Sequence, residues 1–266
     1  MILTNGPVFV HSDTGRGLLA AKRTGAMIET GQVQSSLLTF LASLAPEGEA
    51  SLVFPAFNYD YGKTRSFDIQ KDPVQVGALP EWIRLNRDFH RSEVPFFSFL
   101  SRTDLDLPKT DTINPFDSTS GFHWLVEEDA TFLLFGAAFG TLTFIHYIEE
   151  MSGTPLYRYE KRFPGSIILN GQSRPCNFTM HVRPMGVHMD YDWARLEQEL
   201  LKAGILKLSD RSADIKWIGA RNILEFWGNK ITDDPFYLLD NKSRQHFVKA
   251  TNGGKDRVKL EEYEVA

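Results

Sequence analysis

Short apolar runs alternate with amphipathic segments through the first half of the chain. Four runs have the length of buried strands and are bounded by turn residues, at residues 7–11, 51–57, 131–137 and 166–169. Apolar residues recur at helical spacing in further segments, at residues 34–44, 79–86, 143–151, 192–203 and 220–230. Because strands alternate with helices up to about residue 150, we expect an α/β fold with a layered central sheet flanked by helices.

The pattern changes after about residue 165. Asn170 and Gly171 follow the strand at 166–169 and form a strong two-residue hairpin signal, with 174–182 as the returning strand. We therefore expect one domain, built from an α/β core over residues 1–164 and a hairpin-and-helix C-terminal lobe over residues 165–252. Residues 253–266 are polar and charged, which is typical of a loose tail.

Composition narrows the classes of protein that fit. The chain has 266 residues, of which 42% are hydrophobic and 24% charged, the balance of a globular protein. A net charge of −5 without a long basic run argues against nucleic-acid binding. No apolar stretch reaches the roughly eighteen residues of a membrane span, and the first residues lack the pattern of a signal peptide. We expect a cytoplasmic protein.

The cysteine content limits covalent chemistry. The single cysteine, Cys176, excludes an intramolecular disulfide. Its neighbours show no activating pattern, and we interpret it as a packing residue, with a nucleophile as the alternative. The chain also lacks the Gly-x-Ser-x-Gly motif of α/β-hydrolases.

The strongest candidate for chemistry is the segment 143–150, which directly follows an apolar strand. His146 and Glu149 are three residues apart, so on a helix they share one face. A carboxylate beside an imidazole fixes its tautomer and tunes it as a base. A surface ion pair is the alternative interpretation, and Glu150 fits a solvated carboxylate.

A metal site at the same place is less well supported. His-x-x-Glu resembles part of a carboxylate metal site, but such sites need several ligands on facing helices. No paired ligand spacing occurs at the remaining histidines, which are His11, His90, His123, His181, His188 and His246. We therefore expect no metal.

Two further segments carry polar residues next to predicted strands. Residues 10–17 are expected to form a polar, glycine-containing loop whose backbone N–H groups suit a phosphate, although a plain turn is the alternative and the motif of a P-loop is absent. Residues 95–99 place three phenylalanines around Ser98. This pattern is typical of core packing, with a hydrogen bond from Ser98 to a ligand amide as the alternative.

Taken in order, these segments resemble the antibiotic N-acetyltransferase family, whose best-known members are aminoglycoside 3-N-acetyltransferases. The resemblance extends from about Pro7 to Leu239. It rests on Val8-Phe9-Val10-His11-Ser12, Leu52-Val53-Phe54-Pro55-Ala56-Phe57, Gly77-Ala78-Leu79-Pro80-Glu81, Arg91-Ser92, Pro95-Phe96-Phe97-Ser98-Phe99, Phe132-Leu133-Leu134-Phe135-Gly136 and Thr143-x-x-His146-x-x-Glu149. The last element is the most specific.

The resemblance implies single-step acyl transfer from acetyl-coenzyme A, or another short-chain acyl-coenzyme A, to an amine. It implies that His146 is the general base and Glu149 its partner. It also implies that the coenzyme A side is lined by Ser12, Thr14, Gly15, Arg16 and Ser98. No metal, nucleic acid or membrane partner is implied, and the oligomeric state stays open, a homodimer included.

Departures from the family pattern bear on the acceptor. Val94 and Phe97 stand where the family often has histidine, which predicts a more apolar pocket. We expect the acceptor to contact Tyr59, Tyr61, Phe97 and Glu150. These residues favour a nucleotide-linked amino-deoxyhexose of surface-polysaccharide synthesis. The alternatives are an aminoglycoside and, in another class, a non-catalytic binding protein with the same fold.

Overall fold

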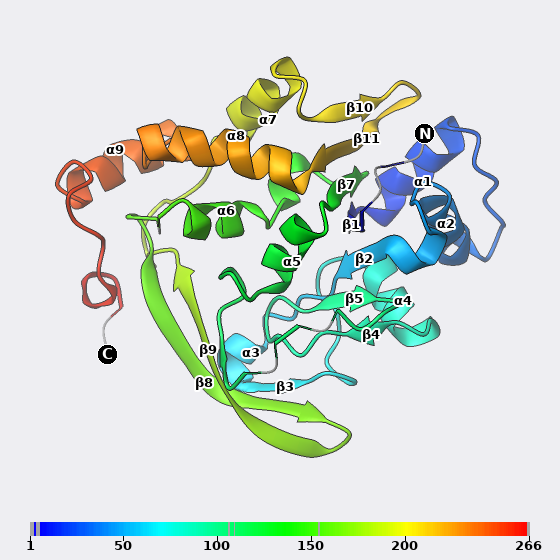
Figure 1. The fold of residues 1–266 in the computed structure, drawn as a ribbon, viewed down its shortest axis with the longest axis horizontal. Helices are drawn as coiled ribbons and strands as arrows, with labels where there is room; N and C mark the ends of the chain where they lie inside the picture. The colour runs from blue at the N-terminus through cyan, green and yellow to red at the C-terminus, as the bar shows by residue number, and fades with distance from the viewer. Residues whose placement is uncertain (1–2, 4–5, 106, 109, 154, 265–266) are drawn as a thin grey trace.

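The structure is a computed structural model that describes residues 3, 6–105, 107–108, 110–153 and 155–264. Within this part of the chain, the larger sheet has seven strands in the order β10-β11-β7-β1-β2-β5-β4. Helices flank it, and the long hairpin of β8 and β9 curves away from it (Figure 1). The predicted layered α/β fold is confirmed.

The centre of the larger sheet is parallel. Strand β1 pairs in parallel with both β2 and β7, while the outer strands are antiparallel to their neighbours. Every residue of β2 and β7 is buried, as expected of parallel strands covered on both faces. The strands of this sheet are β1 (Val8–Ser12), β2 (Leu52–Pro55), β4 (His90–Arg91), β5 (Phe99–Ser101), β7 (Thr131–Phe135), β10 (Lys207–Ser209) and β11 (Ser212–Gly219).

Alternate residues of a strand point to opposite faces of the sheet, and here both faces carry apolar side chains that helices cover. Val8 and Val10 pack with α1, α2 and α4, whereas Phe9 packs in a second core with α5, α6 and α8. The helices are α1 (Thr14–Arg23), α2 (Val33–Ala42), α3 (Tyr61–Thr64), α4 (Ala78–Asn86), α5 (Gly121–Glu127), α6 (Ile145–Met151), α7 (Trp193–Lys202), α8 (Ala220–Asp233) and α9 (Asn241–Ala250). Short 3-10 turns occur at Gly48–Ser51, Phe139–Thr141 and Leu260–Glu262.

The predicted hairpin forms the middle of a smaller sheet. Asn170 and Gly171 have φ values of 52° and 75°, the left-handed pair that a two-residue turn of this type requires. In the described residues this sheet has the order β3-β8-β9-β6. Its strands are β3 (Ser66–Asp68), β6 (Thr112–Ile113), β8 (Tyr159–Leu169) and β9 (Gln172–Val182). Cys176 of β9 is buried in the apolar core of this sheet, as a packing residue would be.

The C-terminal part is more closely integrated than its composition predicted. Strand β11 returns to the larger sheet and pairs with β7, so residues after 165 contribute to the core as well as to the hairpin. Residues 258–264 are not a loose tail, because Val258 is buried and Glu264 binds Tyr159 and Lys161 of β8. These contacts join positions far apart in the sequence, which local polarity does not reveal. In the described part of the chain, no helix is long and apolar enough to cross a membrane.

Candidate active site

A cavity of about 530 Å³ opens at the carboxyl ends of the three parallel strands β1, β2 and β7. In the sheet, β1 lies between β2, the next strand of this sheet in the sequence, and β7. Ligands of α/β proteins commonly bind at the carboxyl ends of strands where the strand order switches in this way. The cavity is lined by His11, Ser12, Asp13, Arg16, Pro55, Phe57, Tyr59, Val76, Gly77, Gly136, Ala137, Ala138, Gly140, Thr141 and Thr143.

The start of α1 forms one wall of this cavity. The segment predicted as a polar loop is in fact the end of β1 and the first turn of α1, which begins at Thr14 with Asp13 as its N-cap. The side chains of His11, Ser12 and Thr14 each hold a buried polar atom that has no hydrogen-bond partner among the described residues. Since buried polar groups are normally paired, these atoms make the wall a candidate for ligand binding; His11 and Ser12 line the cavity, and Thr14 directly follows the lining residue Asp13 in the chain.

Two glycines allow the end of β7 to approach α1. Gly136 has a φ of 72°, and a Cβ atom there would lie 2.4 Å from the backbone nitrogen of Gly17. Any other residue would push the loop after β7 away from the helix. Arg16 also lines the cavity, but its guanidinium pairs with Asp214 of β11 at 2.7 Å, so part of its charge is already compensated.

The loop after β7 leads through Thr143, a cavity-lining residue, into α6. One helical turn later, Nδ1 of His146 lies 3.1 Å from Oε2 of Glu149. The His146 side chain is 29% exposed, whereas that of Glu149 is 2% exposed. The structure therefore brings the two predicted residues together, with the imidazole accessible and the carboxylate behind it.

Glu149 is surrounded by donors that the sequence did not single out. Its Oε1 accepts hydrogen bonds from Tyr157 at 2.6 Å and from Tyr191 at 2.7 Å, and its Oε2 lies 3.1 Å from Nε of Arg158. Burial raises the pKa of Glu149, but the Arg158 charge and the hydrogen bonds lower it by more. The net result is a pKa of about 2. The carboxylate is thus ionised at neutral pH.

The same surroundings keep His146 neutral. Burial and the nearby Arg158 charge lower its pKa below the ordinary value, and the attraction of Glu149 only partly opposes them. We assign the proton of the neutral ring to Nδ1, because Glu149 can only accept a hydrogen bond. The lone pair on Nε2 is then free to take a proton, which is what a general base requires.

Two of the predicted binding residues have structural roles instead. Ser98 is fully buried, and its hydroxyl donates to the carbonyl of Ala56 at 2.6 Å. Tyr61 is also fully buried, and its hydroxyl donates to the carbonyl of Phe163 at 3.0 Å. Both predictions of ligand contact are therefore corrected: these side chains face the interior, which a motif match cannot distinguish from a cleft.

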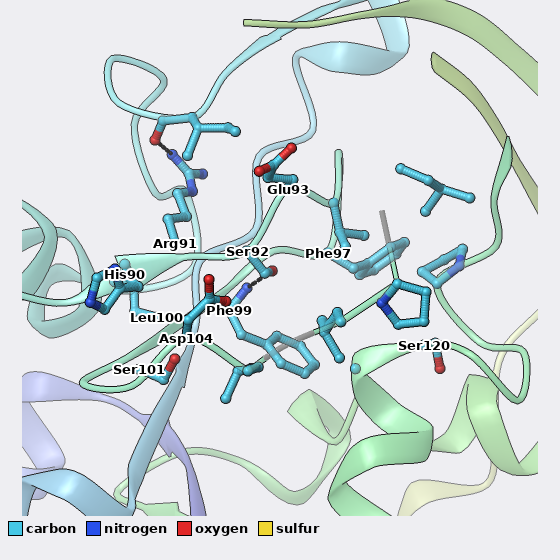
Figure 2. A pocket seen from close by; sticks show the side chains of 18 of the residues that line it. His90, Arg91, Ser92, Glu93, Phe97, Phe99, Leu100, Ser101, Asp104 and Ser120 are labelled. Atoms are coloured by element: carbon cyan, nitrogen blue, oxygen red, sulfur yellow. Dashed lines mark hydrogen bonds between the residues drawn. The ribbon is translucent and has the colours of Figure 1, made fainter. Parts of the chain in front are cut away.

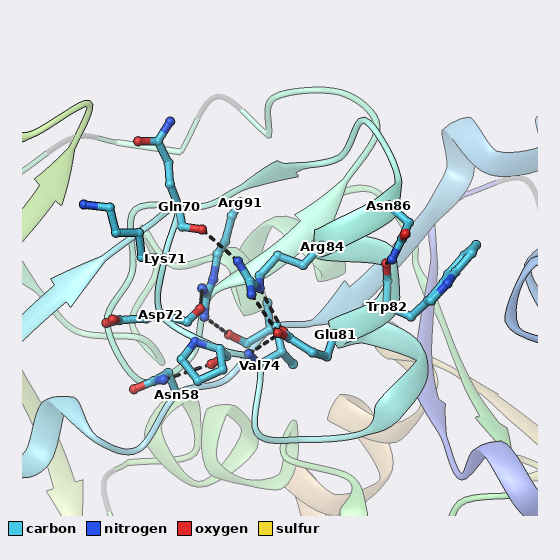
Figure 3. A network of polar contacts seen from close by, with 12 residues as sticks. Asn58, Gln70, Lys71, Asp72, Val74, Glu81, Trp82, Arg84, Asn86 and Arg91 are labelled. Carbon is cyan, nitrogen blue, oxygen red and sulfur yellow. Dashed lines mark hydrogen bonds and ion pairs between the residues drawn. The ribbon is translucent and has the colours of Figure 1, made fainter.

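Ser98 belongs to a polar network that supports this end of the sheet. Arg91 donates to the Ser98 hydroxyl and to the backbone carbonyls of Ala56 and Asp72. Nearby, Arg84 pairs with Glu81 and donates to the carbonyl of Gln70 (Figure 3). Arg91 thus links the segment after β2 to the loop before α4. Its contact with the Ser98 hydroxyl is part of this structural network.

The remaining predicted acceptor residues are separated. Tyr59 is half exposed and lines the cavity at the strand ends. Phe97 packs against Phe57 and Phe116, and Phe116 in turn lies against the ring of His146 at 5.5 Å. Glu150 binds His181 of β9 at 2.8 Å, so its carboxylate is already paired.

A second cavity, of about 460 Å³, is lined in part by Phe97 and Val94. Figure 2 shows Phe97, Phe99, Ser92 and Asp104 on its walls. Asn114 also lines it and lies 3.5 Å from Glu150. The ring of Phe97, which lines this cavity, packs against Phe116, and Phe116 packs against His146.

Sequence reasoning missed Tyr157, Arg158, Tyr191 and Phe116. For Tyr157 and Arg158 the sequence carried no clear signal, because an arginine is usually exposed unless it is paired, and its partner Glu149 is identified only by the fold. For Tyr191 and Phe116 there was none, because they meet α6 only through the tertiary fold. Among the described residues, no group of three or more histidine, cysteine or carboxylate side chains is arranged to hold a metal ion.

Comparison with known proteins gives a consistent picture. The chain resembles the solved structures of aminoglycoside acetyltransferase AAC(3)-IVa (20% identity, 91% of this chain and 88% of that chain, TM-score 0.64) and of AAC-IIIb with CoASH (18%, 87% and 91%, 0.67). It also resembles YokD from Bacillus subtilis (14%, 86% and 87%, 0.62). No match was found among curated proteins.

The family model described as aminoglycoside 3-N-acetyltransferase matches residues 30–231, which is most of the chain. The resemblance seen in the ordered motifs is thereby confirmed. The chain belongs to the aminoglycoside 3-N-acetyltransferase family and is a coenzyme A-dependent N-acyltransferase.

Proposed function

We propose that the chain transfers an acetyl group from acetyl-coenzyme A to an amine of an amino sugar, with an aminoglycoside as acceptor. The observation that supports this most is the contact of the partly exposed His146 ring with the buried Glu149 carboxylate, one helical turn after Thr143, which lines the cavity at the strand ends. A base that is unprotonated at neutral pH is what removal of a proton from an attacking amine demands.

The mechanism follows from these groups. The amine nitrogen attacks the thioester carbonyl while its proton passes to Nε2 of His146. Negative charge then develops on the carbonyl oxygen, and the C–S bond breaks to release the coenzyme A thiolate, which takes up a proton. Glu149 stabilises the imidazolium formed during the transfer. No covalent intermediate is needed, in keeping with the buried, inert Cys176.

We place coenzyme A in the cavity at the strand ends, which Ser12, Asp13 and Arg16 line. The first turn of α1 presents backbone N–H groups, and the hydroxyls of Ser12 and Thr14 lack partners within the described part of the chain. A helix N-terminus with free hydroxyls suits phosphate oxygens. We assign the phosphate contacts to Ser12, Thr14, Gly15 and Arg16.

The acceptor expected from the sequence is revised. Val94 and Phe97, on which the nucleotide-sugar interpretation rested, are partly buried and line the second cavity rather than the cavity at the strand ends. A mutant of the similar enzyme AAC(3)-IVa was solved in complex with a gentamicin, which favours an aminoglycoside acceptor. A role in polysaccharide synthesis has no comparable support, and a non-catalytic role does not fit the family.

The test is a coenzyme A release assay with acetyl-coenzyme A and, in parallel, gentamicin, apramycin or a nucleotide-linked 4-amino-deoxyhexose. We expect kcat/KM to be highest for an aminoglycoside, because this ratio measures discrimination. The His146→Asn variant is the control for background hydrolysis. A clear preference for the nucleotide sugar would overturn the proposed acceptor.

A further inference from the structure

Arg158 and Tyr191 form a closed set of contacts with the Glu149 carboxylate. Arg158 lies with Nε 3.1 Å from Oε2 of Glu149, and its Nη2 donates to the Tyr191 hydroxyl at 2.6 Å. That hydroxyl donates in turn to Oε1 of Glu149 at 2.7 Å. The three residues come from α6, from the segment before β8 and from the segment before α7, so the tertiary fold assembles them.

The same two residues also reach His146. The Tyr191 hydroxyl lies 3.2 Å from Nδ1 of His146, and Nη2 of Arg158 lies 3.4 Å from it. A guanidinium can only donate, and an ionised carboxylate can only accept. Glu149 is the nearest of the three at 3.1 Å, so a lone pair on Nδ1 would face the carboxylate unfavourably. The arrangement therefore favours the Nδ1–H tautomer.

We propose that Arg158 and Tyr191 are positioning residues for the transfer. They hold Glu149 in the orientation in which Oε2 accepts from Nδ1–H of His146, and they thereby keep Nε2 free for the acceptor's proton. The inference rests on the base role proposed for His146. It adds two residues that act through Glu149 without touching the substrate.

The electrostatic consequence separates this site from a simple histidine–carboxylate pair. Glu149 alone would raise the pKa of His146, whereas burial and Arg158 together lower it. The charged and titratable groups in contact with the imidazole are Glu149, Arg158 and Tyr191, and Tyr157 acts only through Glu149. Burial and Arg158 together therefore favour the unprotonated form of the base.

A matched pair of tyrosine variants isolates the positioning role. Tyr191→Phe and Tyr157→Phe each remove one hydroxyl that donates to Oε1 of Glu149, but only Tyr191 also binds Arg158 and approaches His146. We expect Tyr191→Phe to lower kcat for gentamicin about 10-fold, the usual scale for loss of an orienting partner, with the KM for acetyl-coenzyme A little changed. Tyr157→Phe should have a clearly smaller effect. Equal losses in the two variants would overturn the proposal.

A second pair of variants addresses the charge. Arg158→Gln removes the positive charge, so the pKa of His146 should rise and the acidic limb of kcat/KM should move to higher pH. Arg158→Lys keeps the charge and should leave the limb near its wild-type position. NMR titration of the His146 ring in the protein without substrates should show the same result, a higher pKa in Arg158→Gln than in the wild type or Arg158→Lys. The His146→Asn variant identifies the resonance. An unchanged titration in Arg158→Gln would contradict the proposal.

Further outcomes keep the two hypotheses apart. If His146→Asn turns over at the wild-type rate, the base role itself is wrong. If His146→Asn is inactive while Tyr191→Phe and Tyr157→Phe behave alike, the base role stands and the positioning role is wrong. If Arg158→Gln does not fold, as loss of a buried ion-pair partner can cause, the tyrosine pair alone decides.

Discussion

The wall at the start of α1 differs from the cluster around Glu149 in how its polar atoms are satisfied. At the wall, His11, Ser12 and Thr14 each keep a buried polar atom that nothing in the described chain pairs. In the cluster, both oxygens of Glu149 are engaged by Tyr157, Tyr191, Arg158 and His146. Nε of Arg158 has no hydrogen-bond partner among the described residues either, but it lies 3.1 Å from Oε2 of Glu149 as an ion pair.

This contrast separates two tasks of one site. Unpaired polar atoms cost free energy in the empty protein, and a ligand that pairs with them recovers it on binding. A satisfied network gains nothing from a ligand but holds its members in one geometry before the substrate arrives. The wall is therefore suited to binding, and the cluster to chemistry.

The largest effect is expected for His146→Asn. Loss of the general base should lower kcat by at least ~100-fold. Because the side chain is partly exposed, the folded structure should persist, as circular dichroism and thermal unfolding would verify. Turnover near the wild-type level would remove the cluster from the chemistry.

Glu149→Gln should cost less, about 10- to 100-fold in kcat, since the base itself remains. Removing the neighbouring anion lowers the pKa of His146, so the acidic limb of the rate profile should move to lower pH. The measurement is kcat/KM from acidic to neutral pH, and a profile identical to that of the wild type would mean that the two side chains are not coupled.

The stability of this variant provides its control. The pKa of Glu149 is lowered in the folded protein, so its ionised form stabilises the fold above the ordinary carboxyl pKa. That contribution is lost as the pH falls toward about 2. The difference in unfolding temperature between wild type and Glu149→Gln should therefore shrink as the pH falls through this range.

A smaller effect, of a few-fold, is expected at the wall. Ser12→Ala and Thr14→Val should raise the KM for acetyl-coenzyme A by about 3- to 10-fold, the equivalent of one lost hydrogen bond, with kcat little changed. Neither should lower the unfolding temperature, because these hydroxyls have no partner to lose among the described residues. The matched control is Thr251→Val, whose buried hydroxyl donates to the carbonyl of Phe247 and whose loss should destabilise the fold. An unchanged KM would argue against ligand binding at the wall.

The smallest effect concerns Tyr61, which the sequence suggested as a binding residue. Tyr61→Phe removes one buried hydrogen bond to the carbonyl of Phe163, and should lower the free energy of unfolding by about 1 kcal/mol. Steady-state constants for both substrates should stay at the wild-type values. A raised acceptor KM would return Tyr61 to the binding site.

The sequence predicted the parts of the fold that local patterning determines. The apolar runs at 7–11 and 131–137 correspond to β1 and β7, and the Asn170-Gly171 turn was identified from two residues. Strand β11 was missed because its mixture of polar and apolar residues is decided by pairing with β7, far away in the chain.

For the site, helical spacing was enough to predict the contact between His146 and Glu149. It could not reveal Arg158 or Tyr191, which approach from other segments, and it could not tell that Ser98 faces inward. Local spacing identifies neighbours on one helix, whereas partners from different elements require the fold itself.

The late pairing of β11 also has a consequence for biosynthesis. Eighty residues separate Phe135 of β7 from its partner Ile215. While a nascent chain grows, the apolar strand Thr131–Phe135 must wait with one edge open until β11 emerges. Unpaired apolar edges promote aggregation, and sheets joined by distant segments fold slowly. Soluble yield in cells should therefore depend on how quickly β11 is made and docks beside β7.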